Sequence, residues 1–95
     1  MRVAWTRRAL AQLQHQYEYV AARNPRAAEV LLRDCLKQSR LLEQFPFLGK
    51  AIKRGRREKG VQENYVIHYV IAKAAILVMS FWHTSQLRPH GAGEQ

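Results

Sequence analysis

The sequence predicts a single-domain α+β fold: an N-terminal strand, an antiparallel helical hairpin and then a three-stranded antiparallel meander. Two observations support this prediction. Apolar residues recur at helical spacing through the first half of the chain, and after Gly49 they alternate with a period of two. The length of 95 residues and the hydrophobic content of 47% suit one globular domain. We expect this domain to span residues 1–86 and residues 87–95 to form a mobile tail.

The N-terminal segment predicts a short edge strand over residues 2–5, followed by a helix that ends near Arg23. Thr6 is a suitable N-cap, because its hydroxyl can accept a hydrogen bond from an early backbone N–H of the helix. Polar residues surround most of the helix axis, and one apolar stripe is expected to face the core. The residues of this stripe are Leu10, Leu13, Tyr17 and Val20.

Asn24 and Pro25 separate this helix from a second one. Proline disfavours helical geometry in the residue before it but suits the first position of a new helix, so Asn24 is expected to cap the second helix. Phe45 and Pro46 end that helix, and Gly49 marks a turn. The short link makes the two helices antiparallel neighbours. The expected buried stripe of the second helix comprises Ala28, Leu31, Leu32, Cys35, Leu36, Ser39 and Leu42.

Strands are expected at about residues 57–62, 65–72 and 76–82. Alternate side chains of the middle strand should point to opposite faces of the sheet. One face receives Tyr65, Ile67, Tyr69 and Ile71, and the other receives Val66, His68, Val70 and Ala72. The last strand is apolar on both faces, as expected of a central strand covered by helices on one side. The link at Lys73 and Ala74 has no favoured turn pair, so the register of the last hairpin stays open.

Positive charge is concentrated just before these strands. The chain has 16 Lys and Arg against 7 Asp and Glu, a formal charge of +9 at pH 7. Such an excess favours nucleic acid, an acidic protein or an anionic membrane surface as partner without choosing among them. A solvated loop that keeps the protein soluble is the alternative. The crowded residues are Lys50, Lys53, Arg54, Arg56, Arg57 and Lys59.

Cysteine content and hydropathy indicate a cytoplasmic protein. Cys35 is the one cysteine, so an intramolecular disulfide is impossible, and its leucine neighbours favour a small buried hydrophobe over a nucleophile. The N-terminus has no apolar signal core, because Arg7 and Arg8 interrupt it. The longest apolar stretch, residues 74–82, is too short to span a bilayer, so we expect no membrane partner.

Several kinds of active site have no support in the sequence. Asp34 is the one aspartate and the glutamates are dispersed, which argues against a two-metal nuclease. The histidines and Cys35 lack zinc-ligand spacing, and the sequence has neither a phosphate-binding glycine loop nor a serine-nucleophile motif. We therefore expect no metal and no cofactor.

The remaining residues could form a metal-independent site. Cleavage of RNA by its own 2′-OH needs a proton acceptor, a proton donor and positive charge near the phosphate. His83 could act as acid or base because imidazole titrates near neutrality, and Tyr65 or Trp82 could stack a base. In the competing interpretation His83 is a hydrogen-bonded structural residue and Tyr65 a packing residue. The residues that could hold the phosphate are Arg57, Lys50, Lys53 and Arg54.

A set of short motifs extends over residues 3–86 in a defined order and spacing. They are Val3-Ala-Trp5-Thr6, Tyr17 with Val20-Ala21, Asn24-Pro25 followed by Ala27-Ala28, Leu42…Phe45-Pro46…Leu48-Gly49-Lys50, Arg57-Glu58, Tyr65-Val-Ile-His-Tyr69 and Ile76…His83-Thr-Ser-Gln86. No single motif is specific, but together they closely resemble the RelE/ParE superfamily of type II toxin–antitoxin toxins.

The resemblance implies a small bacterial toxin of the RelE-like α+β class that inhibits growth and is held inactive by a cognate antitoxin. Antitoxins of these families wrap the toxin with an extended, often acidic segment, which suits the charge of this chain. The antitoxin commonly supplies the DNA-binding module that represses the operon. The toxin is therefore expected to meet operator DNA only through the antitoxin.

The two branches of the superfamily differ in target. ParE-like members inhibit DNA gyrase and are not enzymes, whereas RelE-like members cleave mRNA in the ribosome. The uninterrupted hairpin and the Asn-Pro-x-Ala-Ala start of the second helix resemble ParE-like members. Arg57 and His83 stand where family members carry a basic residue and a C-terminal His, and they would be catalytic in the RelE-like case. The Tyr that RelE-like nucleases often place near the C-terminus is absent, because residues 84–87 read Thr-Ser-Gln-Leu.

ParE-like gyrase inhibition is therefore the favoured interpretation, and a RelE-like ribosome-dependent endoribonuclease is the alternative. A degenerate toxin kept as a binding module is a third interpretation. Contacts with the target are expected from Lys50, Lys53, Arg54, Arg56 and Tyr65.

Overall fold

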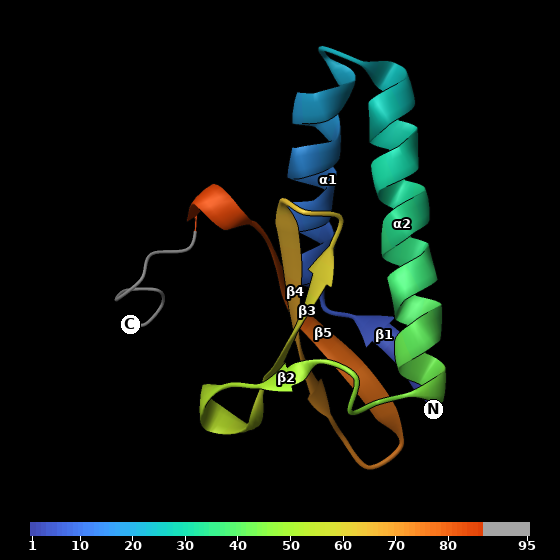
Figure 1. Ribbon diagram of the computed structural model, residues 1–95, viewed down its shortest axis with the longest axis vertical. Helices are drawn as coiled ribbons and strands as arrows, with labels where there is room; N and C mark the ends of the chain where they lie inside the picture. Colours follow the sequence, from blue (N-terminus) through green and yellow to red (C-terminus); the bar gives the residue numbers. More distant parts are fainter. Residues whose placement is uncertain (87–95) are drawn as a thin grey trace.

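The computed structural model describes residues 1–86, in which two helices cover one face of a five-stranded sheet (Figure 1). The strand order is β1-β5-β4-β3-β2. The elements are β1 (Arg2–Trp5), α1 (Arg7–Ala21), α2 (Pro25–Gln44), β2 (Lys50–Ala51), the 3-10 turn η1 (Lys53–Gly55), β3 (Arg57–Val61), β4 (Tyr65–Ile71), β5 (Ala75–His83) and the 3-10 turn η2 (Thr84–Gln86). The expected α+β order of strand, helical hairpin and meander is confirmed. The expected tail, residues 87–95, lies outside the described residues.

Both helices begin at the residues that their capping chemistry predicts. The Thr6 hydroxyl accepts a hydrogen bond from the Ala9 N–H at 3.0 Å, and the Asn24 side-chain oxygen accepts one from the Ala27 N–H at 3.1 Å. Pro25 occupies the first turn of α2, where its missing N–H costs nothing. The link between the helices is so short that α1 and α2 run antiparallel side by side (Figure 1). Neither helix is long and apolar enough to cross a bilayer.

The buried stripes of the helices are narrower than expected. Leu10 is 52% exposed, Leu32 41% and Leu36 52%, so the prediction that these three face the core is wrong. The sheet and the partner helix cover only one side of each helix, and apolar residues at the margins of the stripe remain in solvent. The helix positions that are buried are Ala9, Gln16, Ala28, Leu31, Cys35, Ser39 and Leu42.

The sheet contains the expected meander and two further strands. Strands β3, β4 and β5 pair antiparallel in succession, while β1 pairs parallel with the first half of β5. The two-residue strand β2, which the alternation did not predict, pairs with the start of β3. The alternation of β4 is confirmed, because Tyr65, Ile67 and Tyr69 belong to the core beneath the helices, whereas Val66 and His68 face the opposite side of the sheet.

A β-bulge sets the register of the last hairpin, which the sequence left open. His68 lies opposite Ser80 but Tyr69 lies opposite Val78, so Met79 is the extra residue of β5. The Thr6 hydroxyl donates to the Met79 carbonyl at 3.3 Å. The extra residue reverses the alternation of β5, so that Val78 and Phe81 both face the helices.

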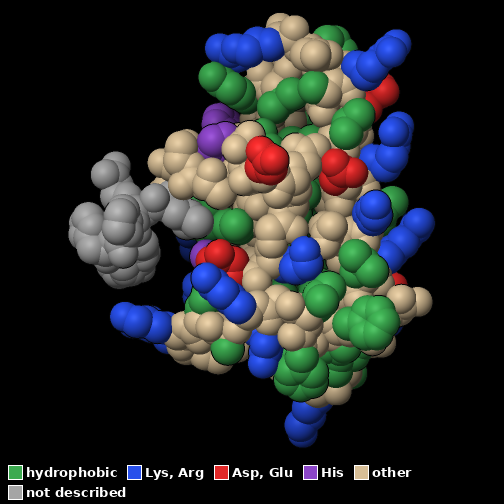
Figure 2. Space-filling view, viewed as in Figure 1, with side chains coloured by type: hydrophobic (Ala, Val, Ile, Leu, Met, Phe, Trp, Pro, Cys, Tyr) green, Lys and Arg blue, Asp and Glu red, His purple; other side chains and the backbone are tan. Residues whose placement is uncertain are grey.

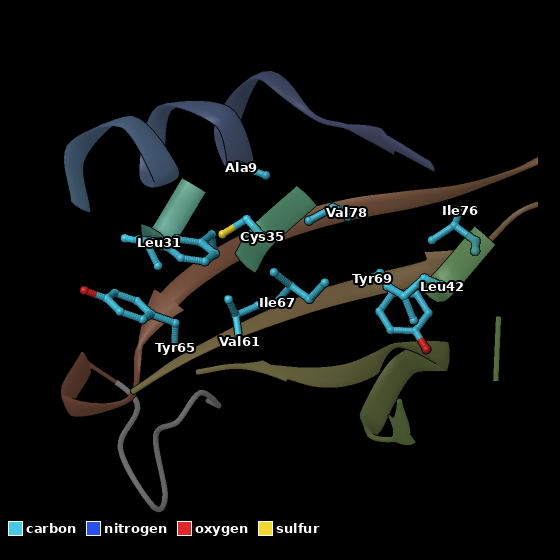
Figure 3. Close-up of a cluster of buried hydrophobic side chains, with 11 residues drawn as sticks. Ala9, Leu31, Cys35, Leu42, Val61, Tyr65, Ile67, Tyr69, Ile76 and Val78 are labelled. Atoms are coloured by element: carbon cyan, nitrogen blue, oxygen red, sulfur yellow. The ribbon is translucent and has the colours of Figure 1, made fainter. Parts of the chain in front are cut away.

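The core lies between this side of the sheet and the helical hairpin (Figure 3). Leu31, Cys35 and Leu42 project from α2 toward the strands, and Ala9 approaches from α1. The sheet contributes Val61, Tyr65, Ile67, Tyr69, Ile76, Val78 and Phe81. The hairpin is therefore fixed on one face of the sheet, and η1 of the β2–β3 connection lies outside the core.

Candidate functional site

The basic side chains of the β2–β3 connection form a projecting loop. Lys50 lies in β2, Lys53 and Arg54 in η1, and Arg56 directly before β3; we call these four residues the basic loop. Arg54 and Gly55 have φ angles of 63° and 72°, so two successive left-handed residues make the turn tight. A left-handed arginine costs free energy, of order 1 kcal/mol. The three exposed side chains of the loop are Lys50, Lys53 and Arg54.

The guanidinium of Arg57 binds the protein itself. Its Nη1 donates to the Gly49 carbonyl at 2.7 Å and approaches the Phe47 carbonyl at 3.5 Å. The guanidinium carbon also lies 4.8 Å from the centre of the Phe47 ring. These contacts hold the segment between α2 and β2, so Arg57 has a structural role that the sequence did not reveal.

His83 and Tyr65 contact each other at the other end of the sheet. The two rings meet edge to face with centres 5.1 Å apart, and Tyr65 stacks on Phe81 at 5.3 Å. The His83 Nδ1 accepts a hydrogen bond from the Ser85 N–H at 3.0 Å, so a neutral ring carries its proton on Nε2. Burial, with smaller contributions from Cys35 and Tyr19, raises the pKa of Tyr65. Only 8% of Tyr65 is exposed, so the packing interpretation of this residue agrees with its position.

The expected catalytic residues do not converge. Arg57 lies opposite Tyr69 and His83 lies opposite Tyr65, on the two strands that flank β4. Tyr65 and Tyr69 are four residue steps apart along β4, which separates Arg57 from His83 by about 13 Å along the strands. A general acid or base must come within about 3 Å of the proton that it transfers, so one phosphate could not contact both groups in this arrangement.

A polar row crosses the face of the sheet opposite the helices, and sequence reasoning missed it. The strand registers align Lys50, Glu58, His68 and Ser80 across β2, β3, β4 and β5. The His68 Nε2 lies 3.1 Å from the Glu58 carboxylate, and the Ser80 hydroxyl accepts a hydrogen bond from the Trp82 indole at 2.9 Å. The alternation of β4 placed His68 on this face, but only the pairing of β3 with β4 identifies Glu58 as its partner.

The described residues contain no cluster of His, Cys, Asp and Glu that could hold a metal ion. Cys35 is buried beneath α2, where desolvation, followed by the nearby Asp34 charge, raises the pKa of its thiol from 9.0 to about 12. A thiol with so high a pKa stays protonated near neutrality and is a poor nucleophile. The structure thus places Cys35 in the core, as its leucine neighbours predicted.

The outer side of α2 combines positive charge with exposed apolar surface. Figure 2 shows Lys and Arg side chains along this helix as well as around β2 and η1. A shallow groove of about 290 Å³ runs along the helix, and we call it the α2 groove. It is lined by Arg33, Leu36, Lys37, Arg40, Leu41 and Gln44. Three cations beside exposed leucines suit an acidic segment that carries apolar side chains.

Comparisons with known proteins agree with this architecture. The model of the family described as ParE toxin of the type II toxin–antitoxin system parDE matches residues 3–88. Toxin RelE2 of Caulobacter vibrioides is 29% identical over 85 residues, which cover 90% of this chain and 97% of that protein.

Two solved structures share the fold. A protein of the chromosomal ParDE toxin–antitoxin system of P. aeruginosa superposes with a TM-score of 0.76 at 20% identity, covering 87% of this chain and 95% of its own. A YoeB/ParE toxin from Agrobacterium tumefaciens gives a TM-score of 0.56 at 17% identity, covering 87% of this chain and 98% of its own. The family match spans nearly the whole described domain, and the chain therefore belongs to the ParE toxin family of type II toxin–antitoxin systems, within the RelE/ParE superfamily.

Proposed function

We propose that this toxin stops growth by inhibiting DNA gyrase through binding, without catalysis. The observation that supports this most directly is the separation of Arg57 and His83. The Arg57 guanidinium is hydrogen-bonded to the Gly49 carbonyl, and the His83 Nδ1 is occupied by the Ser85 N–H at the far end of β4. The Arg57 guanidinium and the His83 ring therefore do not point toward one common phosphate position. A binding mechanism needs no such convergence.

In this proposal the basic loop is the surface that contacts the target. The β2–η1 segment that carries it extends beyond the rest of the sheet, away from the helical hairpin (Figure 1). Lys53 and Arg54 are exposed and make no hydrogen bond to another described side chain, so they can pair with acidic groups of a partner or with phosphates of DNA held by it. Tyr65 lies at the other end of β4, in the core, and in this proposal it supports His83 and does not touch the target.

The cognate antitoxin, in turn, is proposed to dock an acidic amphipathic segment on the α2 groove. The exposed Leu36 would bury apolar surface on binding, and Arg33 and Arg40 would pair with carboxylates of the antitoxin. Association with operator DNA would then depend on the antitoxin. The basic loop would be blocked directly or by the bulk of the bound partner.

A supercoiling assay tests the gyrase proposal. The purified toxin should stall supercoiling by gyrase, and the cognate antitoxin should restore it. Replacing Lys53, Arg54 and Arg56 together by Ala should weaken inhibition, while replacing Arg23 and Arg26 at the tip of the hairpin should not. Supercoiling that continues at excess toxin would exclude the proposal.

A ribosome-dependent endoribonuclease is the second candidate, favoured by the relative named Toxin RelE2. Primer extension on translated mRNA after induction distinguishes the two functions. Gyrase inhibition predicts intact transcripts in both the parent and the His83→Ala variant. Cuts that disappear in His83→Ala would establish the nuclease instead. Normal growth during expression without antitoxin would identify a degenerate toxin that only binds.

A further inference from the structure

A second hollow lies outside the basic loop and the α2 groove, between α1 and the C-terminal half of β5. Its volume is about 260 Å³, and we call it the α1–β5 groove. It exists because β1 pairs only with residues 75–78 of β5, so that α1, and not a strand, runs beside Met79–His83. Besides Ala11, seven polar or aromatic side chains line it: Arg8, Gln12, His15, Gln16, Phe81, Trp82 and Gln86.

Glutamine side chains replace the missing strand along this edge. The Gln12 Oε1 accepts a hydrogen bond from the Phe81 N–H at 2.9 Å. The Gln86 Oε1 accepts one from the His83 N–H at 2.9 Å and another from the Gln16 Nε2 at 3.2 Å. Because backbone N–H groups fix both oxygens, the Nε2 atoms of Gln12 and Gln86 are left as donors. Within residues 1–86 neither Nε2 has a hydrogen-bond acceptor.

Trp82 provides a fixed aromatic surface beside these donors. Its indole Nε1 donates to the Ser80 hydroxyl at 2.9 Å, which holds the orientation of the ring. The Arg8 guanidinium carbon lies 5.8 Å from the ring centre, close to the limit of a cation–π contact. Because Arg8 is exposed, it can move outward to admit a flat group against the indole.

The charge around the groove is positive. Arg8, Gln12 and His15 lie at positions i, i+4 and i+7 of α1, so they share one side of the helix. Among residues 1–86, no acidic side chain lines the groove. A fixed aromatic ring, amide donors, the Arg8 cation and the His15 imidazole form a combination that can bind a base and its phosphate.

We propose that the α1–β5 groove binds one nucleotide, with its base stacked on Trp82 and its phosphate held by Arg8 and His15. The amide nitrogens of Gln12 and Gln86 donate to acceptor atoms on the edge of the base. A free nucleotide and one unit of a single strand present the same chemistry to this groove. The site lies at a different edge of the sheet from the basic loop, and it applies equally to a gyrase-directed and a ribosome-directed toxin.

Tryptophan fluorescence tests the proposal on the purified 95-residue chain. The chain has two tryptophans, and the indole of Trp5 is hydrogen-bonded to Ser39 away from the groove, so Trp82→Phe isolates the signal of interest. The probes are adenosine 5′-monophosphate and a single-stranded hexadeoxyadenylate. Both should quench Trp82 emission at saturation if the groove takes free nucleotides, and the oligonucleotide alone should do so if it takes units of a strand.

Matched variants locate the binding, and their affinities are compared by isothermal titration calorimetry because Trp82→Ala removes the fluorescent group. Arg8→Ala with His15→Ala should weaken affinity at least about ten-fold, and Trp82→Ala should weaken it by between five-fold and a hundred-fold, as for other stacking aromatics. Arg26→Ala removes one exposed cation from the other helix and should leave affinity unchanged. Far-ultraviolet circular dichroism should show that all variants keep the fold.

Three outcomes would overturn the proposal. The first is unchanged Trp82 emission with both probes at millimolar concentration. The second is oligonucleotide binding that the Arg8, His15 and Trp82 variants retain. The third is an equal response to polyglutamate, which would assign the groove to an acidic polypeptide and not to a nucleotide.

Discussion

At the scale of single residues, the hydroxyl of Tyr69 organises the connection between α2 and β2. It donates to the Pro46 carbonyl at 2.7 Å and accepts from the Gly49 N–H at 2.9 Å, although the residue is completely buried. A Cβ at Gly49 would lie 2.7 Å from this hydroxyl, so only glycine fits there. One buried phenol therefore positions the chain just before the basic loop.

Replacing Tyr69 by Phe should lower the free energy of unfolding by about 1–3 kcal/mol, because the change leaves the buried Gly49 N–H and the partly buried Pro46 carbonyl without their hydrogen-bond partner. Urea denaturation measures the loss. Tyr19→Phe is the matched control: Tyr19 is 56% exposed, and its hydroxyl makes no hydrogen bond within residues 1–86. That variant should stay within about 0.5 kcal/mol of the parent. Equal stabilities of the two variants would show that the Tyr69 hydroxyl does not hold the connection.

Cys35 makes stability depend on pH in the alkaline range. Its thiol pKa rises from 9.0 to about 12 on folding, so the unfolded chain loses this proton before the folded one does. The contribution of this thiol to the free energy of unfolding is therefore fully present below pH 9. It falls by about 1.4 kcal/mol per pH unit between pH 9 and about pH 12. Between pH 8 and pH 10.5, the parent should lose about 2 kcal/mol more than Cys35→Ala. Urea denaturation measures the free energy of unfolding of both proteins. Equal losses in the parent and in Cys35→Ala would show that burial does not raise the pKa of this thiol.

At the scale of elements, α2 shows that helical spacing alone does not identify the buried face. Leu31 is 1% exposed and Leu36 is 52% exposed, yet both belong to the same apolar stripe in the sequence. Leu31→Asp would place an unpaired charge between α2 and the sheet and should destabilise the domain by about 3–5 kcal/mol. Leu36→Asp makes the same chemical change in solvent and should cost less than about 0.5 kcal/mol. Thermal melts compare the pair, and similar melting temperatures would refute this orientation of α2.

Most helices and strands could be predicted from the sequence, because they depend on interactions between residues close together in the chain. The Thr6 and Asn24 caps and the alternation of β4 depend on neighbours in sequence, and the structure contains all three. The parallel pairing of β1 with β5 depends on residues more than seventy positions apart, so no local pattern contains it. The two residues of β2 are too few to show an alternation. The bulge at Met79 changes which residues of β5 face the helices. The sequence does not reveal it, because the residues before and after Met79 are similarly apolar.

The candidate site was harder to predict for the same reason. Sequence reasoning identified Arg57 and His83 as basic residues near strand ends, which is correct. Their distance depends on the registers of two hairpins, and those registers place them at opposite ends of β4. The groove beside Trp82 depends on where β1 stops along β5, which is likewise a tertiary property.

At the scale of the whole molecule, most of the positive charge remains available to partners. The chain carries +9 at pH 7 with His counted as neutral, and within residues 1–86 no Lys or Arg lies within salt-bridge distance of an Asp or Glu. Unpaired cations of one sign repel each other, which opposes the compact state, and they attract acidic partners over a distance. The positive charge of the free toxin therefore favours association with an acidic partner.

Association with the cognate antitoxin should consequently slow as salt rises. Screening shortens the reach of charge from about 10 Å at 0.1 M to about 3 Å at 1 M salt, so the rate of association should fall at least about ten-fold over this range while dissociation changes less. Stopped-flow mixing measures both rates. Arg33→Glu in the α2 groove should slow association more than Lys73→Glu in the β4–β5 turn, although both variants lower the net charge equally. Equal rates for the two variants would show that the total charge steers the antitoxin and that the α2 groove does not.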